Sequence, residues 1–137
     1  MRLLLFLWEF PQNLLALILM LYYRIVCGKF TFKEYKGITY VGVPNRRFAV
    51  SLGAFVLLGT VYLDRDTTIK HEYGHTIQSL WFGPLYLILI GIPSGLGNLY
   101  DKFFHTEEKG WTIKDSIKWY YNQPWEKWAD KLGGVER

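Results

Sequence analysis

The sequence predicts an α+β protein in which a short β-sheet packs on a central helix, with an apolar helix before them. Three observations support this fold class. Residues 30–63 alternate between apolar and polar side chains and are rich in β-branched and aromatic residues. Residues 68–81 carry apolar side chains at helical spacing. Residues 3–27 are almost uninterruptedly apolar. We therefore expect an N-terminal helix over residues 1–29 and one folded domain over residues 30–137.

The N-terminal apolar segment is long enough to cross a bilayer, since 25 helical residues span about 37 Å against about 30 Å of hydrocarbon. Glu9 and the Pro-Gln-Asn sequence at 11–13 interrupt it, which predicts a kink or a helix start. We interpret the segment as a membrane anchor that crosses or lies on the bilayer, and the alternative is a core helix of a soluble domain. The nearby basic residues mostly follow it, namely Arg24, Lys29, Lys33 and Lys36. If the segment crosses the bilayer, their position predicts that the N-terminus lies outside and that the folded domain faces the cytoplasm.

Turn residues divide the region of predicted strands. Lys36-Gly37 and the "PNRR" sequence at 44–47 predict two turns. The next apolar stretch, "FAVSLGAFVLLGTVYL" at 48–63, predicts one or two buried strands.

The central helix is predicted over residues 68–81. Its N-cap candidates are Asp66, Thr67 and Thr68, and Gly83-Pro84 should end it. The apolar side chains that recur at spacings of three and four are Ile69, Tyr73, Ile77 and Leu80. We expect these four to form the core face.

Residues 76–100 contain no charged side chain, but several glycines and prolines interrupt them. We expect them to lie against the membrane or in the core, without crossing the bilayer. The predicted elements are a short helix over 85–92 that ends at "PSG", a polar loop over 101–110, and two last helices over 113–121 and 124–132.

The composition excludes several classes of protein. Half of the residues are hydrophobic, which is too apolar for a disordered chain. The net charge is +4 with dispersed basic residues, so we expect no nucleic-acid partner and favour attraction to an anionic membrane. The single cysteine, Cys27, excludes an intramolecular disulfide and a cysteine-based zinc cluster. The oligomeric state is left open.

A pair of histidines on the central helix points to metal chemistry. His71 and His75 are four residues apart, so their imidazoles lie on one helix face and can share one Zn²⁺ ion. Glu72 is rotated by about 100° from His71, beside the ion and not bound to it. A carboxylate there can act as the general base that takes a proton from water. The alternative is a pair of solvated histidines on an exposed face.

A catalytic zinc site takes three protein ligands and keeps one position open. Glu126 and Asp130 are four apart on a predicted helix and share a face. Glu126 can then reach the ion, and Asp130 can accept the outward N–H of a ligating histidine. Glu126 is our expected third ligand. The alternatives are His105 and the other acids, namely Asp101, Glu107, Glu108 and Asp115.

The "HEYGH" and "EKWAD" sequences together resemble the gluzincin branch of the zincin metallopeptidases. The resemblance covers about residues 50–134, and "HEYGH" also resembles small membrane-linked bacterial proteins. It implies a zincin-like domain in which His71, His75 and Glu126 bind zinc, Glu72 is the base and Asp130 supports a histidine. It also implies that "AVSLGAFVLL" could be an edge strand to which a peptide substrate adds, against the alternative of an ordinary buried strand.

These observations predict a membrane-associated zinc metallopeptidase that acts on a peptide or protein substrate. The alternatives are a non-catalytic zinc-stabilised binding module and an intramembrane zinc protease. Candidates for the group that stabilises the oxyanion are Tyr100, His105, Tyr120 and Tyr121.

Overall fold

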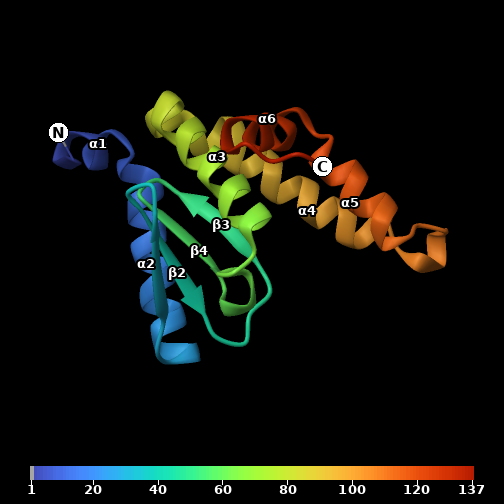
Figure 1. Ribbon diagram of the computed structural model, residues 1–137, viewed down its shortest axis with the longest axis horizontal. Helices are drawn as coiled ribbons and strands as arrows, with labels where there is room; N and C mark the ends of the chain where they lie inside the picture. The colour runs from blue at the N-terminus through green and yellow to red at the C-terminus, as the bar shows by residue number, and fades with distance from the viewer. Residues whose placement is uncertain (1) are drawn as a thin grey trace.

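The computed structural model describes residues 2–137, and it is α+β as the sequence predicts (Figure 1). The helices are α1 (Arg2–Trp8), α2 (Phe10–Cys27), α3 (Asp66–Phe82), α4 (Ile92–Phe104), α5 (Ile113–Tyr121) and α6 (Pro124–Gly133). The strands are β1 (Thr31–Tyr35), β2 (Ile38–Val43), β3 (Ala49–Leu52) and β4 (Phe55–Gly59). Single turns of other helix types are η1 (Thr60–Tyr62), η2 (Gly83–Leu85), η3 (Leu87–Gly91) and η4 (Glu107–Lys109).

The strands form one small mixed sheet in the order β1-β2-β4-β3. Two antiparallel hairpins, β1–β2 and β3–β4, join through the parallel pair β2–β4. The predicted Lys36-Gly37 turn is confirmed, with positive φ angles of 49° and 80° that allow a tight hairpin. Residues 48–63, predicted to form one or two strands, form two, β3 and β4. The later hairpin places β3 at one edge of the sheet, next to α3.

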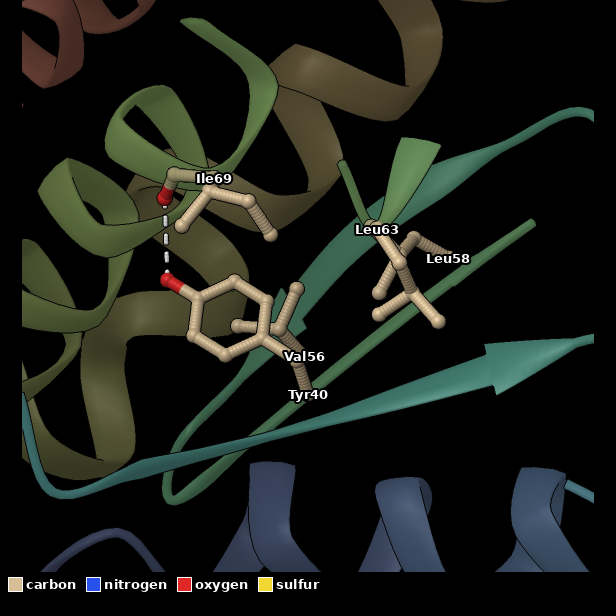
Figure 2. Packing of buried hydrophobic residues seen from close by; sticks show 5 residues of the cluster. All are labelled: Tyr40, Val56, Leu58, Leu63 and Ile69. Atoms are coloured by element: carbon tan, nitrogen blue, oxygen red, sulfur yellow. Dashed lines mark hydrogen bonds between the residues drawn. The ribbon is translucent and has the colours of Figure 1, made fainter. Parts of the chain in front are cut away.

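Helices cover both faces of the sheet. On one face, α3 contributes Ile69, whose carbonyl oxygen accepts a hydrogen bond of 2.9 Å from the Tyr40 hydroxyl (Figure 2). The buried side chains of this layer are Tyr40, Val56, Leu58, Leu63 and Ile69. On the other face, α2 packs through Ala16 against Val41, Leu52 and Leu57. The sheet therefore lies between α2 and α3, and the N-terminal segment belongs to the same packed unit.

The polar residues that interrupt the N-terminal apolar segment bind to the domain. The helix breaks at Glu9, two residues before the proline, so the predicted kink is confirmed. Glu9, Gln12 and Asn13 are all buried. The Glu9 carboxylate accepts a hydrogen bond from the Ser79 hydroxyl, and the Gln12 amide donates to the Gly83 carbonyl at 2.9 Å. Hydrogen bonds to the Glu9 carboxylate and the Gln12 amide nitrogen offset the cost of burying these groups, although Gln12 Oε1 has no partner among the described residues. Within residues 2–137, α2 is the one helix long and apolar enough to cross a membrane.

Two predictions about the central helix are corrected. None of Asp66, Thr67 and Thr68 caps it, because the helix begins at Asp66, one to three residues earlier than those roles require, and Arg65 occupies the N-cap. The core face is also different: of the four apolar residues, Ile69 is buried and Leu80 is 36% exposed. Most of the buried residues of α3 are polar, because α3 is enclosed between the sheet and α6.

The predicted end of a helix at "PSG" is wrong, and the predicted loop over 101–110 is confirmed only from residue 105, because α4 extends to Phe104. The chain stays helical from η2 through η3 and α4 to Phe104. Pro93 lacks an N–H, but it lies in the first turn of α4, directly after the π-helical turn η3. There the Ile92 N–H bonds to the Leu87 carbonyl, five residues back, so the wider turn absorbs the interruption. The two last helices form where the sequence predicts them.

Candidate metal centre

The two histidines of α3 point their Nε2 atoms at one carboxylate of α6. His71 Nε2 and His75 Nε2 each lie 3.1 Å from Oε2 of Glu126. The three possible ligand atoms all lie within 4.8 Å of one another, and all three side chains are buried. The expected trio is therefore brought together by two helices that are far apart in the sequence.

Two glycines allow α6 to come this close to α3. A Cβ at Gly74 would collide with the backbone carbonyl of Ala129, and a Cβ at Gly133 would collide with that of Lys70. The helices touch backbone to backbone at both points, and no pair of elements in the described chain has more extensive contact. This approach sets the distance between Glu126 and the histidines.

The outward nitrogens of both histidines are also held. His71 Nδ1 lies 2.7 Å from Asp130 Oδ1, and His75 Nδ1 lies 2.7 Å from Gln78 Oε1. Gln78 is fixed in turn, because its amide donates to the Trp125 carbonyl at 2.9 Å. Both partners are oxygen acceptors, so each Nδ1 can donate its proton outward, which leaves each Nε2 as the nitrogen that could bind an ion once it has lost its own proton.

Glu126 is fully buried, and its Oε1 finds no hydrogen-bond partner among residues 2–137. Burial alone would raise the pKa of Glu126, but hydrogen bonds to His71 and His75 outweigh it and hold the pKa well below its usual range. Burial would likewise lower the pKa of His71, but hydrogen bonds to Asp130 and Glu126 raise it to about 9. A buried carboxylate with a free oxygen, facing two imidazoles, matches the His₂Glu donor set of catalytic zinc sites.

Glu72 lies in the same buried region of α3. Its Oε2 accepts a hydrogen bond of 2.8 Å from the Ser51 hydroxyl, which belongs to the edge strand β3. The Ser51 carbonyl oxygen is itself 3.3 Å from the buried Tyr86 hydroxyl. Strand β3 therefore positions the carboxylate that the sequence proposes as a base, and it is an edge strand beside the site.

The alternative third ligands lie apart from the histidine pair. His105 Nδ1 is 2.8 Å from Asp101 Oδ1, and its ring stacks on Trp111 with centroids 3.7 Å apart. Asp115 completes a capping box with Thr112 at the start of α5. Glu107 and Glu108 are exposed. The structure thus brings Glu126, and not these residues, to His71 and His75.

Two of the four oxyanion candidates adjoin the site. The Tyr121 ring packs edge-on against His71, with centroids 5.1 Å apart. Tyr120 hydrogen-bonds to Ser94 at 2.9 Å, and burial together with the nearby charge of Glu126 raises its pKa. Tyr100 and His105 pack against each other and against Trp119, away from the histidine pair.

Sequence analysis missed three residues that support the site. The sequence contained a signal that could have identified Gln78, because a polar side chain three residues after His75 lies on the same helix face. No sequence pattern could have identified Ser51 or Arg137. Arg137 Nε donates to Asp130 Oδ2 at 2.6 Å, and only the fold brings the end of the chain there.

Comparison with protein-family models, with curated proteins and with solved structures gives no match. The geometry and the chemistry of the residues described above are therefore the basis for assigning a function.

Proposed function

We propose that this chain is a membrane-associated zinc metallopeptidase in which His71, His75 and Glu126 hold Zn²⁺ and Glu72 is the general base. One observation carries the proposal. Two imidazole nitrogens and one carboxylate oxygen converge in a buried centre, and both imidazoles are held from behind by oxygen acceptors. Three protein donors leave one coordination position for water or substrate, as in catalytic zinc sites.

The bound ion supplies Lewis-acid activation of water and of the substrate carbonyl. Glu72 takes a proton from the attacking water, and Ser51 holds its carboxylate in place through Oε2. The water oxygen bonds to the carbonyl carbon, the C–N bond breaks, and the protonated Glu72 returns its proton to the leaving nitrogen. Asp130 and Gln78 keep both imidazoles oriented throughout. Because β3 is an edge strand next to Glu72, we propose that an extended peptide substrate adds along it.

The two alternative functions are weaker. An intramembrane protease would place α3 inside the bilayer, whereas α3 packs between the sheet and α6, and α2 is the one apolar helix of sufficient length in the described chain. A structural zinc module prefers four protein ligands and has no use for a base. The buried Glu72 beside a three-donor group therefore favours the peptidase.

The test combines zinc content with cleavage of a peptide library. Glu72→Gln should keep one zinc per chain and reduce cleavage by about 10²- to 10⁴-fold, as expected for the loss of a general base. Glu34→Gln is the matched control, because Glu34 is an exposed carboxylate on β1, and it should change neither quantity. Stoichiometric zinc without any cleavage by the wild type would favour the binding module. Absence of zinc binding would refute the site.

We also propose that the site faces the cytoplasm. The basic residues near the end of α2, Arg24 and Lys29, are exposed and attract an anionic lipid surface, which is the property of the cytoplasmic leaflet. Labelling of Gly110→Cys from outside intact cells would contradict this orientation and would place the site on the outer side of the membrane.

A further inference from the structure

The continuous helical stretch formed by η3 and α4 carries a stripe of exposed apolar residues. Its members recur at spacings of three and four, so they line one face of the helix. They are between 46% and 69% exposed, and we call them the α4 stripe: Ile88, Leu89, Ile92, Leu96, Leu99 and Phe103. The sequence predicted that this region lies either in the core or against a membrane. The exposure of these side chains shows that they are not part of the core. Soluble monomers rarely expose a continuous apolar surface of this length.

The α4 stripe begins at a corner where the N-terminal helices also meet. The Trp8 indole N–H donates to the Leu80 carbonyl at 2.9 Å, and its ring packs on Gly83. The Gln12 amide reaches the same glycine. From this corner, α2 runs along the sheet, and η3 and α4 run behind α3 and α6 (Figure 1). Specific contacts therefore join α1 and α2 to the end of α3 and to η2, from which the chain continues directly into η3 and α4.

The outer side of α1 and α2 is apolar as well. Its large exposed residues include Leu4, Leu7, Phe10, Leu14, Ile18 and Leu21. The inner side of α2 carries Ala16 against the sheet, and Asn13 accepts a hydrogen bond from the Ala54 N–H at 2.9 Å. A helix held along the sheet in this way cannot cross a bilayer by itself, because the polar strands would have to follow it into the hydrocarbon.

The charge pattern identifies the occupant of this surface. Residues 76–100 carry no charge, which suits hydrocarbon contact. At the far end of α2, the exposed basic residues are Arg24, Lys29, Arg46 and Arg47, and Arg46 is held there by its contact with Cys27. Between Phe10 and Lys33 the sequence has no acidic residue. The outer side of α2 is therefore an apolar face that ends in cations, which is complementary to an anionic lipid surface, and the uncharged α4 stripe adds a second surface suited to hydrocarbon.

We propose that the α4 stripe and the outer side of α1 and α2 enter one leaflet of an anionic bilayer together, so that the chain is anchored at two places and does not cross. This inference goes beyond the proposed function, which needs only attachment through the N-terminal helix. It also does not depend on zinc or on turnover. The candidate metal centre would then be held at a fixed height above the leaflet, within reach of chain segments that emerge from it.

The experiment measures the membrane depth of α4 directly. In a Cys27→Ser background, an environment-sensitive fluorophore is attached to Leu96→Cys, and Asn98→Cys is the matched control. Asn98 is also exposed on α4, but it is rotated by about 200° from Leu96. The protein is bound to vesicles of phosphatidylcholine with about one quarter phosphatidylglycerol. Spin-labelled acyl chains should quench the label at position 96, and aqueous iodide should quench the label at position 98.

A second pair of variants tests the energetics. Leu96→Glu combined with Leu99→Glu should lower the partition into these vesicles by at least about tenfold, because charged groups replace buried apolar ones. Asn98→Glu should change it by less than about twofold. Equal access of iodide to positions 96 and 98 on bound vesicles would overturn the proposal. Protection of position 96 without vesicles, rising with protein concentration, would overturn it in favour of a second copy of the chain.

Discussion

The backbone contact between α3 and α6 at Gly74 gives the most demanding test of the site. A Cβ at this position would overlap the carbonyl group of Ala129 and would lie 2.9 Å from its Cα. These atoms are backbone atoms, so no side chain can rotate away to make room. Restoring ordinary van der Waals contact requires that α6 move away from α3 by more than about 1 Å. We therefore expect Gly74→Ala to separate the two helices that carry the candidate ligands.

The effect on zinc follows from the position of Glu126, one turn before Ala129 on α6. Metal–ligand distances tolerate only about 0.2 Å, so the required shift is several times too large. We expect zinc affinity to fall by at least about a hundredfold, which is about 2.7 kcal/mol. The free energy of unfolding of the metal-free protein should fall by less than this. Overpacking costs about 1–3 kcal/mol, and replacement of a helical glycine by alanine returns about 1 kcal/mol.

Two measurements separate these effects. Competition with a chromogenic chelator gives the zinc affinity, and urea denaturation of the metal-free protein gives the free energy of unfolding. Gly95→Ala is the matched control, because Gly95 is also helical and a Cβ there meets open space. It should leave zinc affinity unchanged and stabilise the protein by up to about 1 kcal/mol. Wild-type zinc affinity in Gly74→Ala would refute the argument that this contact sets the ligand geometry.

The remaining predictions concern the ligands and their partners. Asp130→Ala should weaken zinc binding by roughly tenfold to a hundredfold, measured by the same competition, because His71 loses the acceptor that orients it. Glu126→Ala should weaken zinc binding more, since a metal ligand is removed, whereas His105→Ala should have little effect. A strong effect of His105→Ala with no effect of Glu126→Ala would reject the gluzincin-like ligand set. The raised pKa of His71, about 9, means that the metal-free protein holds a proton there at pH 7. Zinc binding should therefore release this proton and tighten as pH rises to about 9, which calorimetry in buffers of different ionisation enthalpy can detect. The same shift should make the metal-free protein less stable as pH rises from 6.5 to about 9, because the stabilising charge on His71 is lost.

The local pattern of the sequence determined most of the elements. The alternation in residues 30–63 and the turn residues that divide it predicted the strands, because a strand shows one face to the core and the other outward. The two last helices were predicted within one residue, and a proline and two glycines mark the limits of the second of them. The helical spacing of His71 and His75 placed them on one face, because helix geometry alone relates residues four apart.

Tertiary structure decided what those elements bury and which distant residues meet. The apolar spacing on α3 misidentified its core face, because α3 has a sheet on one side and α6 on the other, and the α6 side is polar. The continuation of α4 through Pro93 depends on a π turn that no residue pattern marks. Helix periodicity gave Glu126 and Asp130 a common face, but only the glycine contacts between α3 and α6 bring that face to the histidines. Local sequence sets the direction in which each side chain points, whereas the meeting of residues about 50 positions apart depends on packing across the whole fold.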